Sequence, residues 1–243
     1  HNSPLNGDIV QGEMAKAEQV LSRMVEAKVT PDAITYSSLL SGYTASGDMI
    51  KGEEVLNRMV TAKVMPNIVT YGTLLNGYAA KGDMHNAEQV AESMTDAQLR
   101  PNFITFCVLM KGYAAKGEMN KAEQVLERMK EVNMSPDAII FNSLLTGYTA
   151  NNKMQHAEQV VERMIEAELE PNDVTYGALL NGYAAKGDME KAEKVLDRMK
   201  EVGLSPNTIT YTALLNGYAA SGGMAMCEDV LERMLKANAS GAD

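Results

Sequence analysis

The sequence predicts an all-α fold, a right-handed superhelical α-solenoid of helix–turn–helix repeats. Six of the seven prolines recur at intervals of 35 residues, from Pro31 to Pro206. A tyrosine recurs at the same interval from Tyr43 to Tyr218, and no insertion breaks the register. Within each interval, the apolar residues follow the spacing of two short amphipathic helices. A hairpin of two such helices cannot bury both apolar faces alone, so consecutive repeats must stack on one another.

The repeat extends over the whole chain, which we predict to be one solenoid domain of seven units. The proline register gives the boundaries 1–32 (with a truncated start), 33–67, 68–102, 103–137, 138–172, 173–207 and 208–243 (with a degenerate end). We refer to these segments as units 1 to 7.

The first helix of each unit is predicted from its apolar face and from its end signal. In unit 3, Tyr71, Leu75 and Tyr78 fall on one helical face. Gly82 follows and can take the left-handed conformation that ends a helix. Six of the seven units have glycine at this position, and unit 5 has Asn152, which tolerates the same backbone geometry.

The second helix is predicted to lie between this glycine and the next proline. In unit 3 its buried face contains Ala87, Val90 and Met94. Pro101 prevents the helix from continuing, and Asn102 can cap the next one. In five units an acidic residue that can cap the second helix follows the glycine: Glu13, Asp48, Asp83, Glu118 and Asp188.

Other residues of the second helix indicate a core face and an outer face. Most of the 18 methionines occupy two positions of this helix, which indicates packing between helices. Cys227 replaces a small alanine of other units, so we predict a buried thiol. A recurring glutamate is predicted to form a solvated outer face with an arginine nearby in most units: Glu18, Glu53, Glu88, Glu123, Glu158, Glu193 and Glu228.

The composition excludes several classes of protein. No apolar run approaches the roughly 20 residues of a membrane-spanning helix, so we expect no membrane insertion. Two cysteines cannot form a disulfide framework, and three histidines leave little for a zinc site or a histidine-based triad. Serine, aspartate and histidine show no catalytic spacing. We therefore predict that the chain is not an enzyme and has no metal site, no cofactor and no small-molecule substrate.

The residue strings of the units resemble a known repeat family. Ile-Thr-Tyr-x-x-Leu-Leu-x-Gly-Tyr, Gly-Asp/Glu-Met, Ala-Glu-x-Val-Leu-x-Arg-Met and Pro-Asp/Asn are similar to the pentatricopeptide repeat (PPR). The tetratricopeptide repeat has about 34 residues and a Trp-Leu-Gly signature that is missing here. The uniform 35-residue spacing resembles the P-class, whose arrays contain one repeat type, and the resemblance covers all seven units.

The resemblance implies a single-stranded RNA-binding protein in which each repeat reads one base on the concave face. One reading residue follows the aromatic residue of the first helix, and the other follows the proline that ends the unit. The implied pairs are Asn2 with Asp32, Ser37 with Asn67, Gly72 with Asn102, Cys107 with Asp137, Asn142 with Asn172, and Gly177 with Asn207, while Thr212 has no partner. The implied RNA, from 5′ to 3′, is U, A, A, G, C or U, A. The pairs with Gly72, Cys107 and Gly177 depart from the family's usual pattern.

The resemblance also implies stacking and phosphate contacts. Aliphatic residues of adjacent repeats would sandwich a base: Ile34, Val69, Ile104, Ile139, Val174 and Ile209. The family often places a phosphate-binding lysine two residues before the glycine that ends the first helix. Here Lys81, Lys116 and Lys186 stand one residue later, which turns the side chain by about 100° and implies weak contacts.

Each of these positions has a second interpretation from the residues alone. An Asp or Asn after the proline caps a helix in any helical repeat. The variable residue after the aromatic can be an unconstrained solvent position. The β-branched residues can serve ordinary helix packing, and the three lysines can face solvent.

Two functions follow from the resemblance. The first is processing, stabilisation or translation of an organellar transcript, in a mitochondrion or chloroplast, by occupation of its RNA. The second is a protein-binding scaffold within a larger organellar assembly, which the net charge of -10 and the displaced lysines favour. The chain starts at His1 without a targeting segment, and its last helix has an apolar face without a successor. We therefore expect a fragment whose end is covered by more repeats, a cap or a neighbouring protein.

Overall fold

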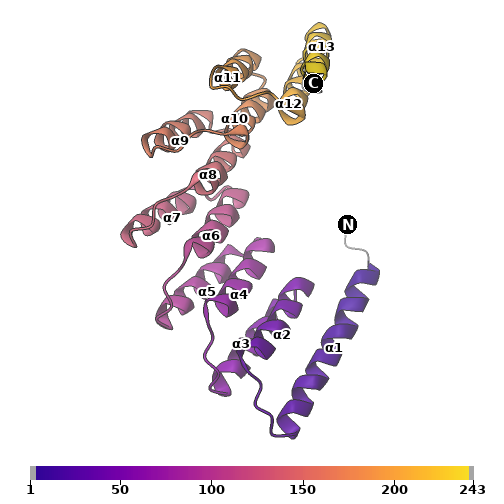
Figure 1. The fold of residues 1–243 in the computed structure, drawn as a ribbon, viewed down its shortest axis with the longest axis vertical. Coiled ribbons are helices and arrows are strands. Elements are labelled where there is room, and N and C mark those ends of the chain that lie inside the picture. Colours follow the sequence, from indigo (N-terminus) through magenta and orange to yellow (C-terminus); the bar gives the residue numbers. More distant parts are fainter. Residues whose placement is uncertain (1–3, 241–243) are drawn as a thin grey trace. The chain divides into compact units, whose positions relative to one another are not determined.

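A computed structural model of the chain describes residues 4–240, and the side chains of residues 14–237 (Figure 1). The described residues form thirteen α-helices and no strand, which confirms the all-α helical-repeat solenoid. The helices are α1 (Pro4–Glu26), α2 (Ala33–Ser46), α3 (Met49–Thr61), α4 (Ile68–Ala80), α5 (Met84–Asp96), α6 (Phe103–Lys116), α7 (Met119–Glu131), α8 (Ala138–Ala150), α9 (Met154–Glu166), α10 (Asp173–Lys186), α11 (Met189–Glu201), α12 (Thr208–Ala220) and α13 (Met224–Ser240).

The helices group into two compact parts, residues 1–112 and 113–243, which we describe separately. In the N-terminal part, α2 packs on α3 and α4, and α4 packs on α5. In the C-terminal part, α8, α10 and α12 pack on one another in order, and α9, α11 and α13 cover them (Figure 1). Each part therefore has a layer of first helices and a layer of second helices.

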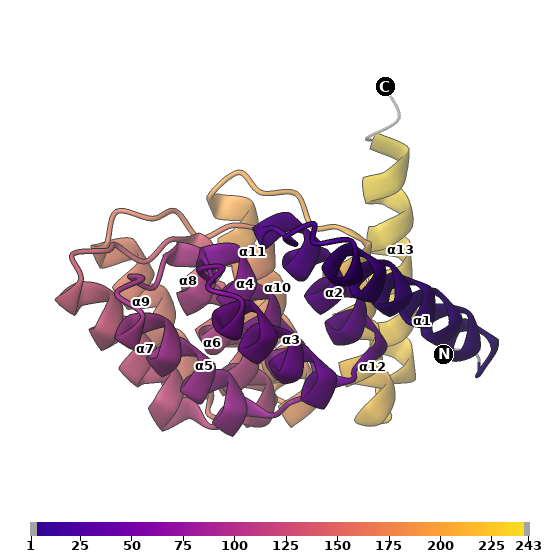
Figure 2. The same cartoon turned by 90° about the horizontal axis from the view of Figure 1, so that it is seen from below.

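Unit 1 differs from the predicted hairpin, because α1 is one unbroken helix that runs through Gly12 (Figure 2). Pro4 and Asp8 stand where the other units have a leucine and the recurring tyrosine. This segment therefore lacks the apolar face that would fold it back onto the residues that follow. Glu13 lies inside this helix rather than at the start of a second one.

The predicted end of the first helix is confirmed in units 2 to 7. Left-handed φ values of 57° to 78° occur at Gly47, Gly82, Gly117, Asn152, Gly187 and Gly222. Asp48 and Asp188 then cap the second helix by accepting a backbone N–H. Glu118 makes no such bond and instead forms an ion pair with Lys121 at 2.8 Å. The second helix ends before the proline, at a left-handed residue such as Gln98 (φ 60°).

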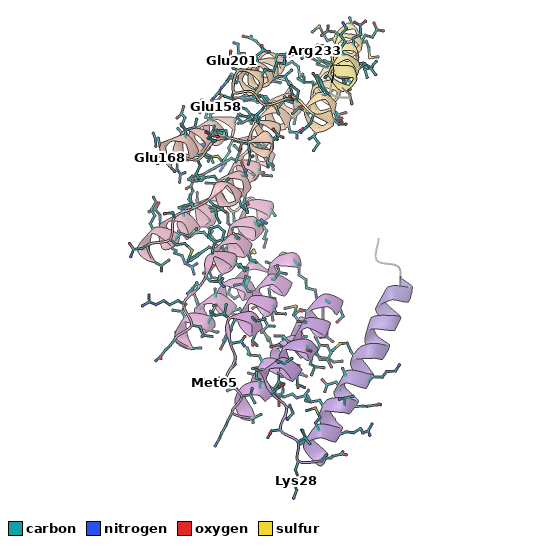
Figure 3. The ribbon with its side chains drawn as sticks, viewed as in Figure 1. Lys28, Met65, Glu158, Glu168, Glu201 and Arg233 are labelled. Carbon is teal, nitrogen blue, oxygen red and sulfur yellow. The ribbon has the colours of Figure 1, made fainter. Side chains whose placement is uncertain are left out.

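The loops that join the units carry outward-facing side chains. Figure 3 shows Lys28, Met65 and Glu168 pointing away from the packed helices. Lys28 and Glu168 take positive φ values of 56° and 59°. This conformation is strained for residues with a Cβ atom, and unit 6 has Gly203 at the equivalent position.

In units 1 to 6, a methionine packs against a glycine in the first helix of the next unit. In α10, a Cβ atom added at Gly182 would lie 2.6 Å from Met154 Sδ and 2.9 Å from Thr149 Cβ. The same close approach joins Met14 to Gly42, Met49 to Gly77, Met84 to Gly112, Met119 to Gly147, and Met189 to Gly217. The predicted role of methionine in packing between helices is thus confirmed, and the glycine that receives it is an additional finding.

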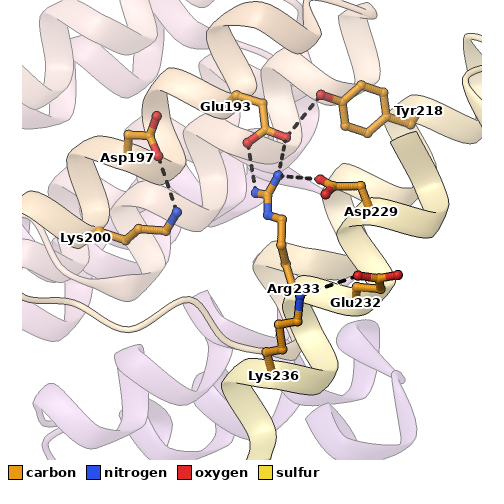
Figure 4. A network of polar contacts seen from close by, with 8 residues as sticks. All are labelled: Glu193, Asp197, Lys200, Tyr218, Asp229, Glu232, Arg233 and Lys236. Carbon is orange, nitrogen blue, oxygen red and sulfur yellow. Dashed lines mark hydrogen bonds and ion pairs between the residues drawn. The ribbon is translucent and has the colours of Figure 1, made fainter. Parts of the chain in front are cut away.

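A polar link also joins consecutive units. In the C-terminal part, Tyr148 Oη donates a hydrogen bond to Glu123 Oε1 at 2.8 Å, and Arg163 lies 3.0 Å from the same oxygen. Figure 4 shows the equivalent cluster, in which Tyr218 and Arg233 both contact Glu193. Three further tyrosines contact a glutamate of the preceding unit: Tyr43 with Glu18, Tyr78 with Glu53, and Tyr183 with Glu158.

The prediction of a simple solvated outer face is therefore wrong for three of these glutamates. The side chains of Glu18, Glu123 and Glu193 are only 25% to 31% exposed, and each holds a tyrosine and an arginine from the next unit. The expected arginine is present in these three clusters. Because the partners are tyrosines and arginines of the following unit, the glutamates connect units rather than cover the surface. Cys227 is buried, as predicted.

The two glycine positions of α10 provide a matched test of the methionine contact. We expect Gly182→Ala to lower the free energy of unfolding by about 1–3 kcal/mol, because the new methyl group overlaps Met154. Gly177→Ala should instead raise it by up to about 1 kcal/mol, because a Cβ atom there meets nothing within 4 Å and alanine favours helix. Urea unfolding followed by circular dichroism checks both, and equal effects would contradict the packing argument.

The tyrosines predict a loss of stability at alkaline pH. Burial, and then the hydrogen bond to Glu123, raise the pKa of Tyr148 to about 12, and the same causes with Glu18 raise the pKa of Tyr43 to about 12. The stabilisation is complete below the unfolded pKa near 10 and is lost as the pH rises toward 12. We expect the free energy of unfolding to fall above pH 10, by on the order of 2 kcal/mol per tyrosine.

The control for this prediction is a pair of Tyr→Phe changes. Tyr43→Phe and Tyr148→Phe remove the titrating hydroxyl groups and should flatten the fall between pH 10 and 12. The absorbance of tyrosinate at alkaline pH reports ionisation directly. Ionisation of these tyrosines near pH 10 in the folded protein would contradict the prediction.

Candidate nucleic-acid interface

Three rows of residues from the first helices form the candidate interface. The reading row is Ser37, Gly72, Cys107, Asn142, Gly177 and Thr212. The cap row is Asp32, Asn67, Asn102, Asp137, Asn172 and Asn207. The aliphatic row is Ile34, Val69, Ile104, Ile139, Val174 and Ile209. Asn2, the predicted reading residue of unit 1, lies outside the described residues.

Every residue of the cap row caps the helix that follows it. Asn172 Oδ1 accepts hydrogen bonds from the backbone N–H groups of Val174 and Thr175, at 3.1 and 3.2 Å. Asp137 Oδ1 accepts from Ile139 and Ile140 in the same way. The other four residues also accept a backbone N–H at the start of their helix. The capping interpretation is therefore confirmed for the whole row.

Capping uses only one of the two polar atoms of each side chain. A backbone N–H needs an acceptor, so the oxygen of each asparagine must face the helix and its amide nitrogen must face away. In Asn67 and Asn172 this nitrogen is a donor directed away from the cap, whereas the second oxygen of Asp32 and Asp137 is an acceptor. The hydrogen bond from the Thr35 backbone N–H lowers the pKa of Asp32 and keeps it ionised. Capping thus fixes the side chain and leaves one defined polar atom for another molecule.

A threonine that sequence reasoning missed helps to orient the cap row. Thr70 Oγ1 accepts the backbone N–H of Asn67 at 3.3 Å, and Thr175 Oγ1 accepts that of Asn172 at 3.1 Å. These reciprocal bonds form capping boxes in α4 and α10. The signal was present in the sequence as a threonine three residues after the cap.

In unit 5, the reading residue and the cap residue contact each other. Asn142 Nδ2 donates to Asn172 Oδ1 at 3.3 Å, and Thr175 Oγ1 donates to Asn142 Oδ1 at 2.8 Å. Asn142 is 9% exposed, so its side chain is held in place before any ligand arrives. One N–H and one lone pair of its amide remain available.

The other reading residues differ in what they offer. Ser37 is half-buried, and Thr212 Oγ1 donates to the carbonyl of Thr208 at 2.7 Å. Cys107 is also half-buried. A Cβ atom added at Gly72 or Gly177 would meet nothing within 4 Å, so these two positions are open space. The reading row therefore has four positions with a side chain and two empty ones, Gly72 and Gly177.

The aliphatic row is exposed, which rejects the interpretation as ordinary helix packing. Its six members are 50% to 75% exposed. In the N-terminal part, Val69 and Ile104 line a pocket of about 750 Å³ together with Gly72 and Asn102. Exposed apolar side chains in a regular row are typical of a binding surface.

The three predicted phosphate-binding lysines have different surroundings. Lys81 Nζ donates to the carbonyl of Gly47 in the preceding unit. Lys116 lies 3.5 Å from Glu118, and Lys186 is exposed. Within residues 4–240, no group of three His, Cys, Asp or Glu residues could hold a metal ion. None of the helices described is both long and apolar enough to cross a lipid bilayer.

Family models of pentatricopeptide repeats match most of the chain. The model of the PPR repeat family matches residues 38–80, 66–115, 136–184 and 174–220, which is more than half of the chain. The pentatricopeptide repeat domain matches residues 2–46 and 107–148, and the PPR repeat matches residues 209–238. A search of curated proteins found no match.

Solved pentatricopeptide repeat structures share the fold. PPR10 from maize aligns with a TM-score of 0.68 and 23% identity, over 97% of this chain and 38% of its own length. PPR10 in complex with an 18-nt psaJ RNA element aligns with a TM-score of 0.55 and 24% identity, over 93% of this chain and 38% of its own length. The PPR domain of Arabidopsis thaliana protein-only RNase P 1, in complex with tRNA, aligns with a TM-score of 0.62 and 18% identity, over 77% of this chain and 98% of its own length. The chain thus spans 38% of the length of the maize protein.

Because each cap residue uses one polar atom for the helix and leaves the other available, two substitutions of Asn172 should have different effects on stability. Asn172→Ala should lower the free energy of unfolding by about 1 kcal/mol, because the N–H groups of Val174 and Thr175 lose their acceptor. Asn172→Asp keeps that acceptor and should change stability by less than about 0.5 kcal/mol. Urea unfolding measures both, with Gln159→Ala on the exposed surface of α9 as control. Equal losses for the two Asn172 variants would contradict the capping geometry.

Proposed function

Because the chain belongs to the pentatricopeptide repeat family, we propose that it binds single-stranded RNA, one base per unit, through the three rows of its first helices. The family assignment rests on repeat matches over most of the chain. Members of the aliphatic row stack on bases, and the reading row and the cap row contact base edges. Only an unpaired strand exposes those edges.

The cap row carries this proposal. Each cap residue is fixed by its own helix and directs a second polar atom away from the cap, beside an exposed aliphatic side chain. The asparagine Nδ2 donor complements N1 of adenine or N3 of cytosine. The second aspartate oxygen complements the ring N–H of uracil or guanine. This chemistry gives a preference for A or C opposite Asn67 and for U or G opposite Asp32.

We further propose that the chain acts without catalysis of its own, by occupying an organellar transcript during processing, stabilisation or translation. The family resemblance supports the organellar role. RNase P proteins are among the structural neighbours, and this chain aligns with the PPR domain of one of them. Phosphate contacts contribute little in this proposal, because Lys81 and Lys116 already have partners within the protein. Stacking supplies roughly 1–3 kcal/mol per base instead.

The protein-scaffold function remains the second candidate. The net charge of -10 disfavours binding to a polyanion, and two of the three predicted phosphate-binding lysines are engaged. A scaffold would use the exposed aliphatic row as a contact surface for another protein.

A titration with matched RNAs tests the RNA function. At moderate salt, the protein should bind an RNA containing UAAGCA more tightly than its scrambled sequence. Asn67→Asp should move the preference at the second base from A to G by about tenfold, because it replaces the donor with an acceptor and keeps the cap. Asn57→Asp, on the exposed surface of α3, adds the same charge in the other helix layer and should leave the preference unchanged.

The outcome separates the two candidate functions. A preference that follows Asn67→Asp and ignores Asn57→Asp supports base reading. If both RNAs bind with the same affinity, or neither binds, the proposal that the protein reads bases is contradicted. A search for a protein that binds the aliphatic row then follows.

A further inference from the structure

A second polar row lies one helical turn after the reading row. Its members are Ser41, Asn76, Lys111, Thr146, Asn181 and Asn216, and all six are exposed. Each stands four residues after a member of the reading row, so both fall on the same helix face. This row has no role in the function proposed above.

Helix geometry directs these side chains toward the reading row. Side chains of an α-helix tilt toward its N-terminus and cover the turn before their own Cα atom. The Cα atoms of residues four apart are separated by about 6 Å along the axis. Asn76 therefore extends over the position of Gly72, and Asn181 extends over the position of Gly177.

Among units 2 to 7, whose reading residues are described, the covered position is empty only in these two units. A Cβ atom at Gly72 or Gly177 would meet nothing within 4 Å. Around Gly72 the space forms part of the 750 Å³ pocket, whose lining also includes Asn76, Asn102, Val69 and Ile104. The same pocket therefore contains both members of the aliphatic row that would enclose the third base.

The amides of Asn76 and Asn181 are available. Among the described residues, neither side chain makes a hydrogen bond, and both are exposed. Thr146, at the same position in unit 5, instead donates to the carbonyl of Asn142 at 2.7 Å. Unit 5 already has Asn142 as a reading side chain, so its second polar residue is not needed for that purpose.

We propose that Asn76 and Asn181 replace the missing reading side chains and make units 3 and 6 specific for adenine; the inference rests on the RNA function proposed above. Asn102 donates its amide N–H to N1 of adenine. Asn76 accepts from N6 and donates to N7, the bidentate pattern by which asparagine recognises adenine. Asn207 and Asn181 do the same in unit 6.

The other three bases fit this arrangement less well. Cytosine offers an acceptor to Asn102 but has no equivalent of N7, and its single ring leaves the space beside glycine unfilled. Guanine and uracil present a ring N–H to the N–H of Asn102, which places two donors against each other. The empty glycine position thus gives room for a purine, and the two asparagines select adenine.

The test varies the third base of UAAGCA and measures dissociation constants for all four RNAs. The wild-type protein should prefer A over C at this base by roughly tenfold, and Asn76→Ala should abolish most of that preference. Thr146→Ala is the matched control, since it removes the residue at the same position of a unit with a reading side chain. It should leave the third-base preference unchanged. Asn76 is exposed, so its truncation should not disturb the fold, which circular dichroism checks.

Repeating Asn76→Ala in a Gly72→Ser variant distinguishes direct reading of the third base by Asn76 from a general loss of RNA binding. Gly72→Ser supplies a reading side chain and fills the space beneath Asn76. In that background, Asn76→Ala should change the third-base preference less than twofold, which is the coupling that a double-mutant cycle measures. A full loss of preference in both backgrounds would overturn the proposed geometry.

The remaining outcomes separate this inference from the RNA function. If the wild-type protein does not distinguish UAAGCA from its scrambled sequence, both ideas fail together. If it does, and Asn76→Ala keeps the full preference for A, the inference alone is overturned and Asn102 reads the base without help.

Discussion

The close contact between a methionine and a glycine of the next unit sets the spacing on which the candidate interface depends. Glycine at position 182 brings α10 against Met154, and the same pair occurs at each described junction within the two parts. Since the first helices carry all three rows of the interface, their separation determines where successive reading positions fall. A larger residue at the glycine would move the rows of one unit relative to those of the next without changing any residue of the candidate interface.

The polar groups of the repeat serve folding first and remain usable afterwards. Asn172 satisfies the start of α10 with one atom, and its second polar atom points away from that helix. Asn142 is held by hydrogen bonds to Asn172 and Thr175, yet one N–H and one lone pair of its amide make no hydrogen bond. An interface built this way needs little rearrangement on binding, which reduces the entropic cost of ordering side chains.

The helices and their caps could be predicted because their signals are local in the sequence. Side-chain contacts between residues far apart in the sequence could not. Gly82 and Asn152 end helices through their own backbone preference, so their roles were visible in the sequence. Glu123 was misassigned because its partners Tyr148 and Arg163 lie 25 and 40 residues away. Unit 1 has the glycine that ends a first helix but lacks the apolar face, so no packing supports a turn there. The cap row was correctly placed, whereas its free polar atom required the hydrogen-bond geometry.

The polar link between units 2 and 3 differs from its neighbours, because Ser93 stands where an arginine would meet Glu53. Repeat proteins behave as one-dimensional chains of nearest-neighbour couplings, so cooperativity is limited by the weakest junction. This junction keeps the contact of Met49 with Gly77, and we expect the missing ion pair, worth up to about 1 kcal/mol, to weaken the coupling between units 2 and 3. Hydrogen exchange in α1 to α3 would then decouple from that of the helices that follow, and ligand binding across the junction would restore their cooperation.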